Sequence, residues 1–385
     1  MSKIICFFVL LFFFAGCKKN SKLSDLTDLQ EINLDFFNQG RSEQLWDSIY
    51  VIPLETKPEC LLGSFRKLVV NKFGIFILDS NKNFFVFNLD GRFRFKVIAT
   101  GRGPEEITKL TNFYIHEQKK YIAIYDHIKH KFFHYDFNGN LQKILDCSTD
   151  IFTDAVEMKV MNNGKLLIRL RFMPGVEHAY AVIDLSDYSL EKFMFPYPFK
   201  WKKGASDVSN LKIAGNISGD FLVNFLSDTI YQYTSGHVYP NCIVKSYLKP
   251  VNYKVIQSNI NDYGDIVSYL NKKPEFSKGI QNLFFTNNVG YTLYFYQNKW
   301  NHVFWNFKSG KGCIFPALYG HKNIFEDLKF MAVTENYFIG VIPAYNILPE
   351  NISPYTSKDI TEKLLSVQED DNPILVFYYI NSENL

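Results

Sequence analysis

The sequence lacks several features that would place it in a familiar class of protein. Its longest apolar run, Ile4–Ala15, has twelve residues, whereas a helix needs about 20 to cross a bilayer. Its 42 Lys and Arg residues nearly balance 39 Asp and Glu residues, so no basic excess indicates a dedicated nucleic-acid-binding protein. With only 21 Gly and 14 Pro, the chain is neither collagen-like nor of low complexity.

Motifs built for catalysis or metal binding are also missing. No CxxC pair occurs, which excludes a zinc ribbon and a thioredoxin-type redox site. There is no Ser nucleophile elbow. The segment 101–104 (GRGP) is no phosphate loop, because Pro104 lacks an N–H and no Lys-Ser/Thr pair follows it. We therefore predict no catalytic, cofactor-binding or metal-binding residue.

The cysteines beyond the first twenty residues are few and widely spaced. Four cysteines permit three disulfide pairings, but the even spacing places each in a different structural unit, so we expect isolated buried thiols. They are Cys60, Cys147, Cys242 and Cys313.

The N-terminus has the pattern of an export signal. Lys3 precedes the apolar run, and the sequence Ala-Gly-Cys ends it at Cys17, before the polar Lys18. This pattern resembles the bacterial lipobox, in which the cysteine becomes the new N-terminus and carries the lipid. We expect residues 1–16 to be a lipoprotein signal peptide and Cys17 to be the lipid attachment site. The alternative is an ordinary cleaved signal with an incidental cysteine.

The polar segment 17–46 is expected to be a lipidated tether, with one short strand near Glu31–Asp35. It begins Cys-Lys-Lys-Asn-Ser, without the acidic cluster that surface-exported lipoproteins of the Bacteroidetes type carry. That resemblance implies a cell-envelope protein, anchored through its N-terminal lipid in the outer membrane and facing the periplasm.

A repeat of several strands fills the rest of the chain. Hydrophobic residues make up 47% of the sequence and aromatic residues 17%, enough for a large core. The pattern Ile-x-Ile-x-Asp ends at Asp79 and recurs 47 residues later at Asp126. Each copy continues into a hairpin turn, Asp90-Gly91 or Asn138-Gly139, of a type that needs positive φ. A period of about 40–50 residues is typical of β-propellers.

Four weaker copies follow, the last without an outermost strand. The early strand Ile49–Leu54 has no unit of its own, so pairing it with the last unit closes a ring and removes an open edge. We predict an all-β fold over residues 47–385, a six-bladed β-propeller closed by an N-terminal strand. Apolar spacing predicts short helical insertions at Ile260–Leu270 and Ser357–Ser366.

One loop carries a family resemblance. Residues 99–107 (ATGRGPEEI), with IPLET at 52–56 and NPILVF at 372–377, resemble the Bacteroidetes six-bladed propeller lipoproteins with NHL-like repeats. Their loop usually reads GRGPGEY, so Glu105 replaces a Gly and Ile107 an aromatic residue. The resemblance implies the fold and the envelope compartment. It does not identify active-site residues, because the family has no assigned biochemical function.

The same loop supplies the candidate ligand contacts. In propellers such loops lie at one mouth of the central channel, so Arg102, Glu105 and Glu106 are possible ligand-binding residues, with Arg102 binding an anionic group. The alternative is a structural turn between blades, with Arg102 tied to a carboxylate or to carbonyls.

Other chemically suggestive residues have structural explanations. The recurrence of Asp79 and Asp126 favours an Asx-type turn. His130 and His134 lie about 13 Å apart on a strand, too far for one zinc ion with His127. The aromatic stretch 291–307 is a candidate sugar-stacking platform, but filling the wedge between blades explains it better.

Three classes of function stay open. The first is a binding module for an envelope protein, a secreted peptide or a glycan, with no cofactor and no nucleic acid. The second is a glycan hydrolase or lyase at the channel mouth. The third is a purely structural envelope component. The missing catalytic motifs and the anchoring signal favour the first.

Overall fold

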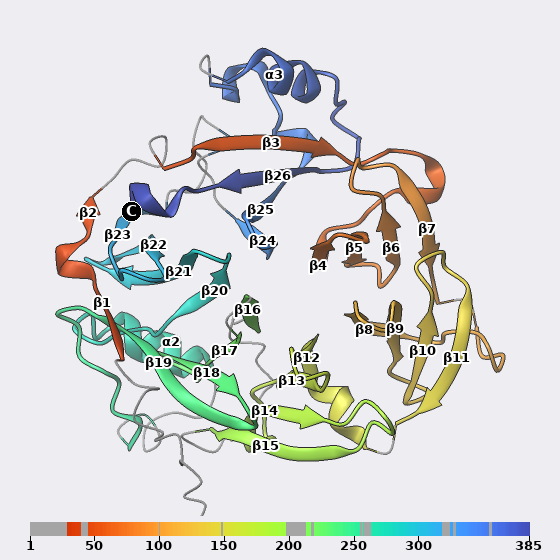
Figure 1. Cartoon of the computed structure of the whole chain (residues 1–385), viewed down its shortest axis with the longest axis horizontal. Coiled ribbons are helices and arrows are strands. Elements are labelled where there is room, and N and C mark those ends of the chain that lie inside the picture. The colour runs from red at the N-terminus through yellow and green to blue at the C-terminus, as the bar shows by residue number, and fades with distance from the viewer. Residues whose placement is uncertain are drawn as a thin grey trace, which may run out of the picture.

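Six β-sheets arranged in a ring form the protein, a six-bladed β-propeller (Figure 1). The computed structural model describes residues 29–39, 45–99, 101–147, 149–197, 213–216, 219–254, 256, 263–317, 324–325, 329–353 and 356–385. The predicted signal peptide, Cys17 and the start of the tether lie outside these residues.

Blades 1 to 3 each have four strands that follow one another in the chain. Blade 1 comprises β4 (Phe65–Asn71), β5 (Gly74–Asp79), β6 (Phe84–Phe87) and β7 (Phe93–Val97). Blade 2 comprises β8 (Leu110–His116), β9 (Tyr121–Asp126), β10 (Lys131–Tyr135) and β11 (Leu141–Asp146). Blade 3 comprises β12 (Ala155–Val160), β13 (Leu166–Leu170), β14 (His178–Ile183) and β15 (Leu190–Pro196).

Blades 4 to 6 each include a strand from the N-terminal part of the chain. Blade 4 comprises β16 (Ala214–Asn216), β17 (Gly219–Val223), β18 (Thr229–Thr234), β19 (His237–Lys245) and β1 (Gln30–Asn33). Blade 5 comprises β20 (Gln281–Phe285), β21 (Val289–Tyr296), β22 (Lys299–Asn306), β23 (Gly312–Pro316) and β2 (Asn38–Gln39). Blade 6 comprises β24 (Phe330–Val333), β25 (Tyr337–Ile342), β26 (Ile374–Tyr379) and β3 (Ser48–Pro53).

The ring is closed by the early strand, as the sequence predicts. Strand β3 pairs antiparallel with β26 along its whole length, from Pro53 opposite Ile374 to Ser48 opposite Tyr379. The N-terminal and C-terminal parts of the chain therefore share the sheet of blade 6. The predicted all-β, six-bladed fold with N-terminal closure is confirmed.

A second N-terminal element, residues 30–39, runs across the outside of blades 4 and 5; we call it the strap. Its first strand, β1, matches the strand expected near Glu31–Asp35 and pairs in parallel with β19. Strand β2 pairs in parallel with β23. This part of the expected tether is thus built into two blades.

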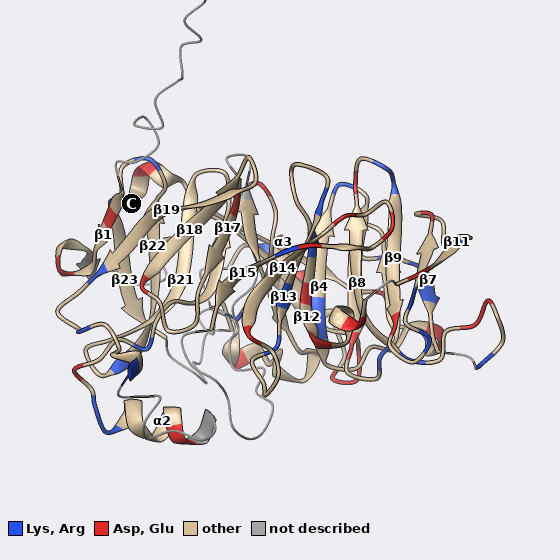
Figure 2. Cartoon of the chain, turned by 90° about the horizontal axis from the view of Figure 1, so that it is seen from below, with Lys and Arg blue, Asp and Glu red and all other residues tan. Residues whose placement is uncertain are grey.

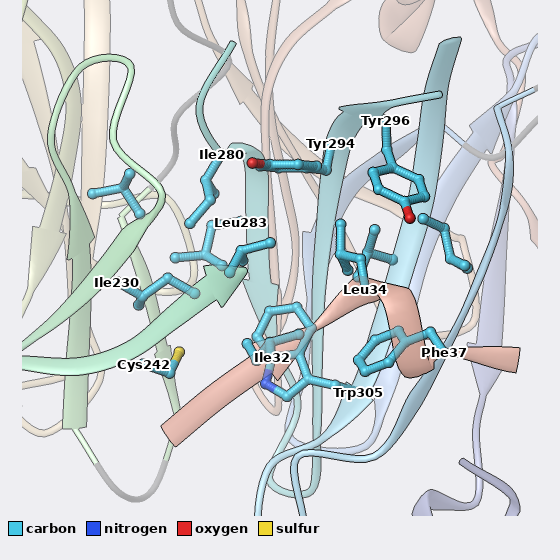
Figure 3. Packing of buried hydrophobic residues seen from close by; sticks show 14 of the residues in the cluster. Ile32, Leu34, Phe37, Ile230, Cys242, Ile280, Leu283, Tyr294, Tyr296 and Trp305 are labelled. Carbon is cyan, nitrogen blue, oxygen red and sulfur yellow. The ribbon is translucent and has the colours of Figure 1, made fainter. Parts of the chain in front are cut away.

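Buried side chains hold the strap in place. Ile32 (0% exposed), Leu34 (2%) and Phe37 (9%) insert between blades 4 and 5 and share a core with Tyr294 and Trp305 (Figure 3). Tyr296 adds a hydrogen bond from its hydroxyl to the carboxylate of Asp35, at 2.6 Å. Burial of three large apolar side chains makes the strap a part of the core.

Buried carboxylates explain the sequence repeat. Asp79 ends β5 and accepts hydrogen bonds from the backbone N–H groups of Gly63 (3.0 Å) and Asn83 (2.9 Å). Asp126 ends β9 and accepts hydrogen bonds from the backbone N–H groups of Thr108 (2.6 Å) and Ile128 (2.8 Å), the latter in the turn that follows β9. Each carboxylate therefore joins a turn inside its blade to the segment that enters the blade, which confirms the structural role predicted for both residues.

The aromatic stretch 291–307 divides into two groups. Tyr291, Tyr294, Phe304 and Trp305 are at most 1% exposed and belong to the clusters between blades, so wedge filling is confirmed for them. Phe295 and Trp300 stand opposite each other at the end of the β21–β22 hairpin and are half-buried.

The two insertions contain helices. Helix α2 (Tyr263–Asn271) follows blade 4 and projects from one face of the ring (Figure 2). It overlaps the helix predicted from Ile260, whose first residues lie outside the described ones. Helix α3 (Lys358–Leu365) packs outside β3 (Figure 1), and Ser357 caps it by accepting the N–H of Ile360. No helix among the described residues is long and apolar enough to cross a membrane.

The four cysteines of the propeller are free thiols. Cys60 and Cys242 are fully buried, and Cys147 and Cys313 are half-buried. Burial raises the pKa of the Cys147 and Cys313 thiols to about 12, so they are protonated at neutral pH and unreactive.

Candidate functional site

The predicted ligand loop joins β7 to β8 and is closed by its own side chains. A Glu106 carboxylate oxygen accepts the N–H of Gly103 at 2.7 Å, and the Thr108 hydroxyl donates to the carbonyl of Gly101 at 2.9 Å. Lys129, in the β9–β10 turn, donates to the carbonyls of Gly103 and Glu106, both at 2.5 Å. The loop is therefore fixed on the second turn of blade 2.

The three predicted ligand residues have different surroundings. Glu106 builds the turn, and its carboxylate lies so close to Gly101 and Gly103 that a Cβ at either position would displace it. Arg102 and Glu105 have exposed side chains, and neither makes a hydrogen bond or an ion pair within the described part of the chain. Their role as ligand contacts stays a prediction, with Arg102 presented to solvent on a fixed turn.

Two histidines lie beside the loop, and the third lies inside the blade. The rings of His127 and His130 are 6.3 Å apart, and His130 is 3.5 Å from the carboxylate of Asp150. His134 is buried and hydrogen-bonds the Tyr188 hydroxyl at 2.5 Å. The structure does not bring the three imidazoles together, and it shows no group of three His, Cys, Asp or Glu suited to a metal ion among the described residues.

Three further cationic side chains lie near this loop. Lys129 is engaged by the loop carbonyls, as described above. Lys109 precedes β8, and Arg171 follows β13 in the neighbouring blade. Burial lowers the pKa of His127, and the positive charge of each of these two side chains lowers it further. Sequence reasoning missed Lys109 and Arg171, because they are 62 residues apart and meet only through the packing of blades 2 and 3.

One lysine joins the innermost strands of neighbouring blades. The Lys67 ammonium, from β4, donates to the carbonyls of Phe113 at 2.8 Å and Met158 at 3.0 Å, and to the Asn112 side chain at 3.3 Å. These acceptors come from blades 2 and 3. Lys67 thus ties the innermost strands of three blades together.

A second exposed cluster lies at the end of the β21–β22 hairpin. The Phe295 and Trp300 rings are 5.5 Å apart at 74°, and the Lys278 ammonium lies 3.6 Å from the centre of the Phe295 ring. Tyr247 is 57% exposed and accepts the N–H of Gln297 at 3.2 Å. Because Lys278 covers one face of Phe295, this cluster offers little open ring surface for stacking a sugar.

These features define a class of protein: a six-bladed β-propeller whose rigid ring holds exposed loops in fixed positions. The chain belongs to the family described as "Domain of unknown function (DUF4934)", whose model matches residues 30–379. The match begins at the first residue of β1 and ends at the last residue of β26. The strap is therefore part of the family's domain.

Solved structures from Bacteroides share this fold. A putative exported protein from Bacteroides fragilis NCTC 9343 has a TM-score of 0.70 at 16% identity, covering 91% of this chain and 100% of that chain. A member of the DUF4221 family from Bacteroides vulgatus ATCC 8482 has a TM-score of 0.50 at 13% identity, covering 88% of this chain and 97% of that chain. No curated protein matches the sequence.

Proposed function

We propose that this protein is a binding module of the cell envelope, anchored through a lipid on Cys17 in the outer membrane and facing the periplasm. Its partner is a protein, a secreted peptide or a glycan. The lipobox-like sequence at residues 14–17 (FAGC) and the description of the Bacteroides fragilis neighbour as a putative exported protein support this location.

The observation that carries the binding function is the guanidinium of Arg102, which lies on a fixed turn and has no hydrogen-bond or ion-pair partner among the described residues. The loop carbonyls and Glu106 are satisfied by Thr108, Lys129 and Gly103, so the turn keeps its shape without help from Arg102. The turn holds the backbone of Arg102, and its exposed guanidinium is available for a bidentate contact with a carboxylate, sulfate or phosphate. A ring of blades with variable loops is a suitable scaffold for such a contact, although the fold alone does not define a function.

Affinity capture from native envelope extract tests the binding function. The lipidated protein is crosslinked and its partners are identified by mass spectrometry, beside the Arg102→Ala variant. Arg92→Ala is the matched control, because Arg92 is also exposed but pairs with Asp90 in the β6–β7 turn of blade 1. We expect one stoichiometric partner that Arg102→Ala loses and Arg92→Ala retains. No enriched partner with any form would contradict the proposal and favour a screen for glycan turnover.

The anchor is tested separately. Cys17→Ser should abolish incorporation of labelled fatty acid and move the protein from the membrane fraction to the soluble periplasmic fraction. A Cys60→Ser variant, which changes a buried thiol of the propeller, controls for nonspecific effects of losing a cysteine. Unchanged lipid labelling in Cys17→Ser would show that the attachment site was wrongly assigned.

A further inference from the structure

Backbone hydrogen bonds place Lys109 and His127 side by side. The N–H of His127 donates to the carbonyl of Lys109 at 2.9 Å. The Asp126 carboxylate accepts N–H groups from Lys109 at 3.3 Å and Ile128 at 2.8 Å. The two side chains therefore leave neighbouring backbone positions that a buried carboxylate holds fixed.

Arg171 lies just after the end of β13 in the next blade. Its N–H donates to the carbonyl of Asp154 at 2.8 Å, the last residue of the 3-10 helix η5 (Asp150–Asp154). Phe152 of η5 packs 5.6 Å from the ring of Tyr125, which directly precedes Asp126 at the end of β9. This packing places Arg171 at the junction of blades 2 and 3, where its charge acts on the His127 imidazole.

The positive charges at this junction are not neutralised by the protein. The side chains of Lys109, His127 and Arg171 make no hydrogen bond or ion pair within the described part of the chain, and the Nε of Arg171 is buried without an acceptor there. Three acidic residues lie nearby. Asp126 has both carboxylate oxygens bonded to backbone N–H groups, and Asp150 contacts His130. Asp154 accepts the N–H of Arg171 through its backbone carbonyl, and its carboxylate makes no ion pair with a described residue. A buried donor without an acceptor is costly, so an anion at this point would be stabilised.

We propose that Lys109, His127 and Arg171 form a binding site for the anionic oxyacid group of a ligand, at the junction of blades 2 and 3. Such a group is a carboxylate, a sulfate or a phosphate. Arg171 supplies donors for one edge of it, and Lys109 supplies a second charge. This inference rests on the proposed binding function for the source of the ligand, and it places the anionic part of that ligand beside the Arg102 loop.

The site makes binding dependent on pH. Burial lowers the pKa of His127, and Lys109, His130 and Arg171 lower it further, while Asp126 opposes them. The imidazole is therefore neutral at pH 7 and gains its charge only in more acidic solution. An anion bound beside it favours the charged form, so the affinity for the anion rises as the pH falls.

Titration of the histidines by NMR tests the site directly. Full-length protein in detergent micelles, labelled at histidine Cε1, is titrated from pH 8 to pH 5 in chloride and then, at equal ionic strength, in sulfate, phosphate or glucuronate. We expect the preferred anion to raise the pKa of His127 by about one pH unit, which corresponds to a tenfold gain in affinity on protonation. His237, exposed in blade 4, is the internal control.

Two variants identify the groups responsible. Lys109→Gln and Arg171→Gln should each reduce the anion-dependent change at His127, whereas Lys311→Gln, an exposed lysine of blade 5, should leave it unchanged. If His127 and His237 respond equally to all three anions, the site does not exist, whether or not a partner is captured. If the anion shifts His127 but no partner is captured, the site stands and the proposed envelope partner fails.

Discussion

Blades 2 and 5 reach the same four-stranded core by different means. In blade 2 the second and third strands have six and five residues, and its turns are set by Asp126 and by the Asn138-Gly139 pair. In blade 5 the corresponding strands have eight residues each. They turn at Gln297 and Asn298, both with positive φ, and the strap covers the outer edge. Blade 2 is stabilised mainly by local contacts, whereas blade 5 depends on distant segments.

The largest expected effect is in blade 2. Asp126→Ala removes a fully buried carboxylate and leaves several backbone N–H groups without an acceptor, which should lower the free energy of unfolding by roughly 3–5 kcal/mol. Chemical denaturation measures this loss. Asp136→Ala is the control, because Asp136 makes the same kind of turn contacts on the surface, and its loss should be about 1 kcal/mol. Equal losses would contradict the role of the buried carboxylate.

The dependence of blade 5 on the strap predicts the next effect. Leu34→Ala removes a side chain that is 2% exposed between blades 4 and 5 and should cost about 3 kcal/mol. Phe36 lies in the same strap but is 84% exposed, so Phe36→Ala should change the free energy of unfolding by no more than about 0.5 kcal/mol. A small effect of Leu34→Ala would mean that the strap detaches without disturbing the ring.

The smallest effect concerns pH, and here the two blades should behave alike. Burial lowers the pKa of His134 in blade 2 to about 4 and that of His302 in blade 5 to about 3. Both rings are hydrogen-bonded to a tyrosine hydroxyl, of Tyr188 and Tyr291 respectively. The unfolded chain takes up protons near pH 6.5 that the folded protein excludes, so stability falls as the pH drops.

Each of these histidines should therefore cost about 1 kcal/mol of stability between pH 7 and pH 5.5. Urea denaturation at several pH values measures this slope, and His302→Phe should make it shallower. His237→Phe, at an exposed position, should leave the slope unchanged. A slope that is steeper in His302→Phe would show that His302 is protonated in the folded state.

The comparison also shows which parts of the fold a sequence can reveal. Asp79 and Asp126 have local partners, so their pattern recurs with the period of the blade and predicts both the repeat and the turn. The closing strand Ile49–Leu54 could be predicted because one strand was left over and one blade was incomplete. A strand near Glu31–Asp35 could be predicted, but the pairing of the strap could not. Blades 4 and 5 have four strands each without it, so no incomplete blade indicated that residues 30–39 add to β19 and β23.

The candidate site also has one part that the sequence predicts and another that only the structure reveals. The GRGP loop is a local motif, so Arg102, Glu105 and Glu106 could be named from the sequence. That Glu106 closes the turn and Arg102 does not could only come from the structure. Lys109 and Arg171 have no sequence signal, because single cations on separate blades look like ordinary surface residues until the blades are packed together.

The closure by β3 has a consequence for how the protein is made. Its partner strand β26 ends at Tyr379, so a nascent chain holds β3 unpaired until β26 has been synthesised and, for an exported protein, translocated. A product truncated before residue 374 would have five complete blades and an open sheet edge on β3, the kind of edge that promotes aggregation. Completion of the ring thus distinguishes chains that include β26 from shorter ones, whose unpaired β3 leaves them exposed to proteolysis.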